Sequence, residues 1–145
     1  MIQCLLMVVR GIAVVFWSPI FWKAAIKSLF TTLIYYGSEH LPLSNPNLIV
    51  VEGDIRDTAR LAKCMEGVDA VVNMACISND ASFELDSDLS TTVNLDAFEP
   101  MIIAAKIADV KRFVYTSTSS VYGVSDQPDV TEDHPLVPLT LYNDY

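Results

Sequence analysis

Short apolar runs alternate with helical stretches along most of this chain, and that alternation restricts the fold more than any other feature. The runs with the apolar, β-branched character of buried strands are 48–51, 69–75 and 112–116. Between them, Asp57 begins a helical stretch that Gly67 ends, and residues 89–108 form a longer helix that we expect to be broken or kinked at Pro100. Strands separated by such helices predict an α/β fold with a parallel sheet and helices on both of its faces.

The composition supports one globular domain and excludes several classes of function. The chain has 145 residues, of which 52% are hydrophobic, so it can bury one core and is not disordered. Its net charge of −9 makes nucleic acid an unfavourable partner. The cysteines Cys4, Cys64 and Cys76 form no CxxC pair, and His40 and His134 are far apart in the sequence. We therefore expect no metal site, no disulfide framework and a reducing, cytoplasmic compartment.

The first 38 residues differ in character from the rest of the chain. They contain three basic residues and no acidic one, whereas all eighteen acidic residues follow. Arg10 and Pro19 interrupt the apolar stretch, so neither uncharged run reaches the ~20 residues that a membrane span needs. A membrane anchor is thus the less favoured interpretation, although a membrane-tethered protein stays open as an alternative function.

A cluster of hydroxyl side chains follows the last predicted strand. Residues 116–120 are five consecutive serines and threonines, which places donors and acceptors at the carboxyl edge of the sheet, where α/β proteins bind ligands. From these residues alone, a strand end that makes Ser/Thr turns is an equally good interpretation.

Three motifs in this order resemble one enzyme family. They are GDIRD at 53–57, VVNMAC at 71–76 and YTSTSSVYG at 115–123. Together they resemble the extended short-chain dehydrogenase/reductases, specifically the NAD-dependent epimerases and dehydratases of nucleotide sugars, over residues 31–145. The resemblance implies a Rossmann-like fold, NAD as cofactor with NADP as an alternative, a nucleotide-sugar substrate and possible homodimers of the intact protein.

The resemblance also implies a set of cofactor-binding residues, namely Asp54, Ile55, Ala75, Cys76, Asn94 and Ser117. The Asp54 carboxylate would accept a hydrogen bond from the exocyclic amine of the adenine. Ala75 and Cys76 stand where the family has two small alanines, and Asn94 would support the end of the sheet near the active site. A solvated helix residue is nearly as good an interpretation of Asn94.

Two further residues take catalytic roles by the same resemblance. Thr118 matches the family's hydroxyl that polarises the substrate, and Tyr142 begins the family's YxxxK, in which lysine lowers the pKa of the tyrosine base. Tyr145 ranks second as the base. The lysine would be residue 146, so we expect an incomplete fragment without its substrate domain and with little or no turnover. A non-catalytic dinucleotide-binding or regulatory module is the main alternative function.

The family's glycine-rich phosphate loop is not found at the start of the chain. Residues 1–30 contain one glycine, Gly11, where the fold normally has GxxGxxG. In a shifted reading frame, Met7 followed by Val8 must encode glycine, and the neighbouring codons permit GGAGYxGS. Our hypothesis is that residues 1–30 are a frameshifted form of the first βαβ unit, before a partial NAD-binding domain at 31–145; the coding DNA decides it.

Overall fold

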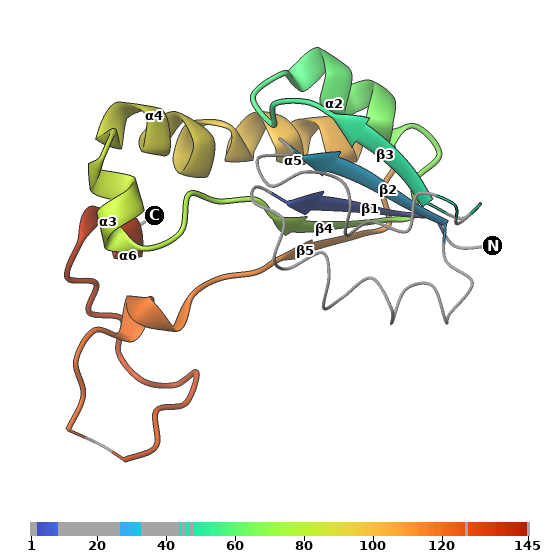
Figure 1. Ribbon diagram of the computed structural model, residues 1–145. Helices are drawn as coiled ribbons and strands as arrows, with labels where there is room; N and C mark the ends of the chain where they lie inside the picture. Colours follow the sequence, from blue (N-terminus) through green and yellow to red (C-terminus); the bar gives the residue numbers. More distant parts are fainter. Residues whose placement is uncertain are drawn as a thin grey trace.

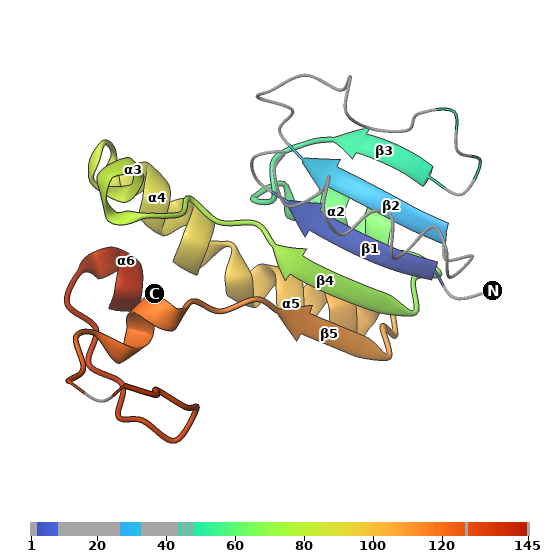
Figure 2. The same ribbon diagram turned by 60° about the horizontal axis from the view of Figure 1, so that its bottom comes forward.

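The computed structural model describes residues 3–8, 27–32, 44, 46, 48–126 and 128–144. Within 3–8 and 27–32 it describes the course of the backbone only. Figure 1 shows the arrangement of these segments, and Figure 2 shows it from a second direction.

Five parallel strands form one sheet. The strands are β1 (Gln3–Val8), β2 (Lys27–Thr32), β3 (Leu48–Glu52), β4 (Ala70–Met74) and β5 (Arg112–Tyr115). Their order across the sheet is β3-β2-β1-β4-β5, and every neighbouring pair is parallel. This is the strand order of the first five strands of a Rossmann fold, with the reversal of direction between β1 and β4. The predicted α/β class and the three predicted strands are confirmed.

The sheet also draws two strands from the start of the chain. β1 lies between β2 and β4, with Leu5 beside Leu29 on one side and Val71 on the other. β2 spans residue 30, where the sequence predicts the start of the partial NAD-binding domain, and the division at this residue stays a prediction. The connection between β1 and β2, residues 9–26, lies outside the described residues, and so does most of the segment to which the frameshift hypothesis applies.

The helix after β3 begins and ends as its sequence predicts. α2 covers Thr58–Met65, and the Asp57 carboxylate caps it by accepting a hydrogen bond of 3.0 Å from the Arg60 backbone N–H. Leu61 and Met65 lie one turn apart and are both buried. Gly67 ends the helix with a φ of 71°, in the left-handed region that glycine adopts without strain.

The second long helical stretch has its irregular turn before Pro100 and not at it. α4 (Ser87–Thr91) leads into a π-helical turn, η1 (Thr92–Asp96), and then into α5 (Phe98–Ile107). The Ala97 N–H bonds to the Thr92 carbonyl at 3.1 Å, which is the wide hydrogen bond of a π turn. Pro100 lies in the first turn of α5, where a missing N–H costs little. The break expected at Pro100 was therefore placed too late in the chain.

The core forms between the sheet and the helices α2 and α5, which cover the same face (Figures 1 and 2). The most deeply buried residues of this core are Leu61, Met65, Val71 and Met101, each at most 3% exposed. The helix expected on the opposite face would lie between β1 and β2, outside the described residues. Two further short helices, α3 (Asp80–Glu84) and α6 (Leu141–Asp144), lie beyond the carboxyl ends of the strands together with α4.

Candidate cofactor and active site

The loops with the predicted site residues converge at one edge of the sheet. β3 ends at Glu52, β4 at Met74 and β5 at Tyr115, and all three strands are parallel. Their carboxyl ends therefore share one edge, toward which the arrowheads in Figure 1 point. This edge is where open α/β sheets bind ligands.

Asp54, in the loop after β3, is held by Arg56. The Arg56 backbone N–H donates to Asp54 Oδ1 at 2.9 Å, and the guanidinium Nη2 donates to Oδ2 at 2.5 Å. These hydrogen bonds from Arg56 lower the pKa of the Asp54 carboxyl from its ordinary value, against the opposing effect of partial burial. The carboxylate is consequently ionised at neutral pH, and about a third of its side chain is exposed. The next residue, Ile55, is buried.

The loop after β4 is shaped by two asparagines. Asn73 is buried, and its Oδ1 accepts a hydrogen bond of 3.0 Å from the Ala75 N–H, which turns the chain at the strand end. Asn94, in η1, uses its whole amide: its Oδ1 accepts from the Ile77 N–H at 2.8 Å and its Nδ2 donates to the Ile77 carbonyl at 3.1 Å. Asn94 is thus a support of this loop and not a solvated helix residue.

The hydroxyl cluster divides into side chains with different surroundings. Thr116 joins two strand ends, because its N–H and its hydroxyl both donate to the Asn73 carbonyl, at 3.1 and 3.2 Å. Ser117 is exposed. Thr118 accepts a hydrogen bond of 3.2 Å from the Ser120 N–H and so caps a 3-10 helix, η2 (Ser119–Tyr122). Accepting that bond leaves the Thr118 hydroxyl hydrogen to donate to another oxygen.

Gly123 fixes the segment that leads away from the hydroxyl cluster. Its φ of 66° favours glycine, and a Cβ atom there would lie 2.3 Å from the Val137 carbonyl oxygen. The Val137 N–H donates to the Val121 carbonyl at 2.9 Å, so the two segments pack closely. This packing brings α6, with Tyr142, beside η2.

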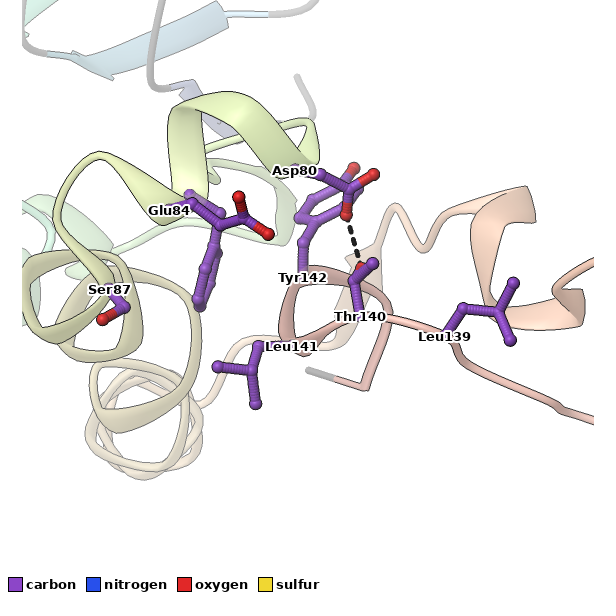
Figure 3. Close-up of a pocket in the computed structure, with 8 residues that line it drawn as sticks. Asp80, Glu84, Ser87, Leu139, Thr140, Leu141 and Tyr142 are labelled. Carbon is purple, nitrogen blue, oxygen red and sulfur yellow. Dashed lines mark hydrogen bonds between the residues drawn. The ribbon is translucent and has the colours of Figure 1, made fainter.

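Tyr142 lines a pocket of about 290 Å³ between α3 and α6. The other lining residues are Asp80, Phe83, Glu84, Ser87, Leu139, Thr140 and Leu141. The Tyr142 ring packs against Phe83, with 6.5 Å between the ring centroids. The Thr140 hydroxyl donates to the Asp80 carboxylate across the pocket, and this bond joins α3 to the segment before α6 (Figure 3).

Tyr115, at the end of β5, is a neighbour of this site that the sequence did not single out. Burial raises the pKa of its phenol, and the nearby Cys76 and Tyr142 raise the pKa further. Because Cys76 and Tyr142 both act on Tyr115, the end of β5, the loop after β4 and α6 lie in one neighbourhood. Burial also raises the pKa of the Cys76 thiol. Tyr115 lies inside the quoted YTSTSSVYG, but an aromatic residue at a strand end gives no functional signal by itself.

The structure thus brings the predicted residues together at two places on one edge. Asp54 and Ile55 lie in the loop after β3, whereas Ala75, Cys76 and Tyr142 lie near the end of β5. Thr118 caps η2 and Tyr142 lies in α6, and these two elements contact each other. In the part of the chain that the structure describes, no three His, Cys, Asp or Glu residues gather as metal ligands. None of the described helices is long and apolar enough to span a membrane.

Comparison with known proteins agrees with the motifs. Residues 29–144 match the model of the NAD-dependent epimerase/dehydratase family. The chain is 34% identical over 101 residues to the low-salt glycan biosynthesis protein Agl12 of Haloferax volcanii, covering 70% of this chain and 33% of that protein. It is 31% identical over 130 residues to a 3-beta-hydroxysteroid dehydrogenase of Mycolicibacterium neoaurum, covering 81% and 35%.

A solved structure has the same fold. It is the dTDP-glucose 4,6-dehydratase DesIV of Streptomyces venezuelae with NAD and TYD bound, which superimposes with a TM-score of 0.86 at 27% identity. The superposition covers 99% of this chain and 48% of that one. The chain spans about a third of the length of the curated relatives it matches. The strand order, the three motifs and the family match over residues 29–144 together show that this chain belongs to the NAD-dependent epimerase/dehydratase family.

Proposed function

We propose that this chain is the NAD-binding part of an enzyme that carries out hydride transfer at a carbon of a nucleotide sugar. The observation that supports this most is the convergence of the Asp54 loop, the Ala75–Cys76 loop and the hydroxyl cluster at one edge of a Rossmann sheet. That edge is where such sheets hold dinucleotides.

The described residues suit the two ends of NAD. At one end the ionised Asp54 carboxylate offers an acceptor to the adenine amine, and at the other the small, buried Ala75 lets the backbone approach a ring. When bound, NAD supplies the acceptor or donor of a hydride. The loop after β1, where the resemblance places the pyrophosphate, and the residues after β2, which would discriminate NAD from NADP, lie outside the described residues.

In this proposal the catalytic roles fall to two hydroxyl groups. The free hydrogen of the Thr118 hydroxyl donates to the oxygen of the reacting sugar carbon and stabilises the charge that develops there. Tyr142 is the base that takes the proton of the sugar hydroxyl. The pocket beside Tyr142 has the volume of a small-ligand site at the low end of the usual range, ~300 Å³.

The sugar rather than the steroid is the proposed substrate because the pocket is polar at several points. Asp80, Glu84, Ser87 and Thr140 contribute carboxylate and hydroxyl groups to its lining. Such groups bind sugar hydroxyls by hydrogen bonds. Asp80 and Thr140 already bond to each other, but a steroid skeleton against Glu84 would desolvate its carboxylate without offering a new partner.

Calorimetric titration of the 145-residue chain tests the proposal. We expect saturable binding of NAD with one site per chain, and tighter binding of dTDP-glucose or UDP-glucose once NAD is bound. Tyr142→Phe and Thr118→Val should weaken the binding of the sugar nucleotide and leave that of NAD largely unchanged. Absence of NAD binding, or equal binding of a steroid and a sugar nucleotide, would contradict the proposal.

A further inference from the structure

The Arg56 side chain connects Asp54 to a helix from another part of the chain. Its Nε lies 3.0 and 3.1 Å from the two Asp54 carboxylate oxygens, and Nη2 lies 2.5 Å from Oδ2. The remaining amine, Nη1, donates to the Thr92 hydroxyl at 3.0 Å. The guanidinium thus contacts a residue two positions before it and a residue 36 positions after it.

The π-helical turn η1 supports both loops of the sheet edge through this contact. Thr92 is its first residue and binds Arg56, while Asn94, two residues later, binds the backbone of Ile77. The Thr92 hydroxyl also donates to the Leu89 carbonyl at 2.7 Å, which fixes its oxygen toward Arg56. The loop after β3 and the loop after β4 are therefore both bonded to this one turn.

The contacts with Arg56 leave part of the Asp54 carboxylate accessible to a ligand. A carboxylate has about four lone-pair positions, and three N–H groups of Arg56 occupy most of them. The Asp54 side chain is nevertheless about a third exposed. Only arginine presents a planar fork that fixes a carboxylate in this way, since the lysine ammonium is a point charge without a preferred plane.

We propose that Arg56 is a positioning residue for base recognition, which holds the Asp54 carboxylate in place, with Thr92 as its anchor, to receive the amine of an adenine. This inference rests on the proposed function and adds a specificity to it. Adenine carries an amino donor at position 6, where hypoxanthine carries a carbonyl acceptor. A carboxylate fixed opposite position 6 binds the amino group of adenine and repels the carbonyl oxygen of hypoxanthine.

Titrations with AMP and IMP, followed by amide shifts in NMR spectra, measure this preference directly. The two nucleotides have the same charge, so their affinity ratio reports the contact at position 6 and not general attraction. In the wild-type chain we expect AMP to bind at least about tenfold more tightly than IMP. Arg56→Gln should remove most of this preference, and Arg56→Lys should not restore it, because the charge alone does not orient the carboxylate.

Two more variants separate the parts of the inference. Thr92→Val leaves Arg56 paired with Asp54 but without its anchor, so the preference should fall by roughly threefold. Arg60→Gln is the matched control: it removes an equal charge from the neighbouring helix, and no described contact joins its side chain to Asp54. The AMP preference of the Arg60→Gln variant should equal that of the wild type.

The outcomes distinguish this inference from the proposed function. If the wild-type chain binds AMP over IMP and Arg56→Gln does so equally, Arg56 does not position Asp54, while the cofactor site stands. If Thr92→Val keeps the full preference for AMP, Thr92 does not anchor the Arg56 side chain. If the wild-type chain binds neither AMP nor NAD, both proposals are overturned. Thermal unfolding of each variant checks that a loss of the AMP preference does not come from unfolding of the chain. Because Arg56 is exposed, we expect its variants to stay folded.

Discussion

Gly123, next to the hydroxyl cluster, lies too close to the backbone of Val137 to carry a side chain without a shift of the chain. Gly123→Ala would place a methyl group 2.3 Å from the Val137 carbonyl oxygen at a positive φ. We expect it to lower the free energy of unfolding by more than about 1 kcal/mol in urea denaturation. Gly53→Ala is the control, because its nearest neighbour is the flexible Arg60 side chain at 3.2 Å. Equal losses for the two variants would contradict the strained geometry.

Asn94 is the side chain that we expect to hold the loop after β4. Asn94→Ala removes both hydrogen bonds to Ile77, so the backbone N–H and carbonyl of Ile77 lose these partners. The expected loss is roughly 1–3 kcal/mol, with faster hydrogen exchange at the Ile77 amide. Asn94→Asp keeps the acceptor but not the donor, so Ile77 should retain part of its protection. Unchanged exchange in both variants would show that other contacts hold the loop.

Asp54 and Arg56 give a prediction about pH. Because Arg56 lowers the pKa of Asp54 in the folded chain, the pair contributes stability above the unfolded pKa. That contribution is lost as the pH falls through the folded pKa. In carbon-13 NMR titrations Asp54 should therefore titrate below the ordinary range of aspartate, and Arg56→Gln should raise its pKa. The same pKa in both proteins would exclude the pairing in solution.

The sequence motifs predict where some residues of the candidate site lie and miss the contacts of others. The motifs of Asp54 and Thr118 place both residues after strand ends, and the structure has them there, while their roles stay predictions. Arg56 lies in the same GDIRD motif, yet its contact with Thr92 spans 36 residues, and no local pattern predicts such a pair. Asn73 lies in the VVNMAC motif, but only the structure shows that its side chain accepts from the Ala75 N–H and turns the chain at the strand end.

At the scale of elements, the long helical stretch shows where periodicity stops being informative. The π turn at Thr92–Asp96 adds a residue to the helix repeat, so the buried face shifts from one part of the stretch to the next. Ala104 and Ala105 are buried on α5, whereas the apolar Ile103 is 49% exposed. A proline signals a helix irregularity in a sequence, but a π turn has no comparable signal.

Substitution of Pro100 tests whether the π turn, and not the proline, sets the course of the helix. Pro100→Ala restores an N–H in the first turn of α5, where the helix does not need it. The free energy of unfolding should change by less than about 1 kcal/mol. Asp57→Ala is a comparison at another helix start, since it removes the cap of α2 and should cost about 1 kcal/mol. A larger effect at Pro100 would mean that the proline, and not the π turn, sets the course of the helix.

At the scale of the whole molecule, the alternation of strands and helices after Leu48 was enough to predict the parallel sheet. It was not enough to predict the two strands before it. The first 38 residues are apolar with few turn residues, so their strands have no visible boundaries in the sequence. The pairing of β1 with β4 joins residues more than sixty positions apart, which only the assembled sheet specifies.

We propose that the carboxyl edge of this sheet holds NAD with its adenine at Asp54 and its nicotinamide near Tyr142. Intermolecular nuclear Overhauser effects between NAD and the isotope-labelled chain measure that placement without requiring turnover. We expect contacts from the adenine protons to the Asp54–Arg56 loop and from the nicotinamide protons to the Tyr142 ring and the Thr118 methyl group. Contacts from the adenine to Tyr142 and from the nicotinamide to the Asp54–Arg56 loop, or contacts confined to residues away from this edge, would contradict the proposed placement of NAD.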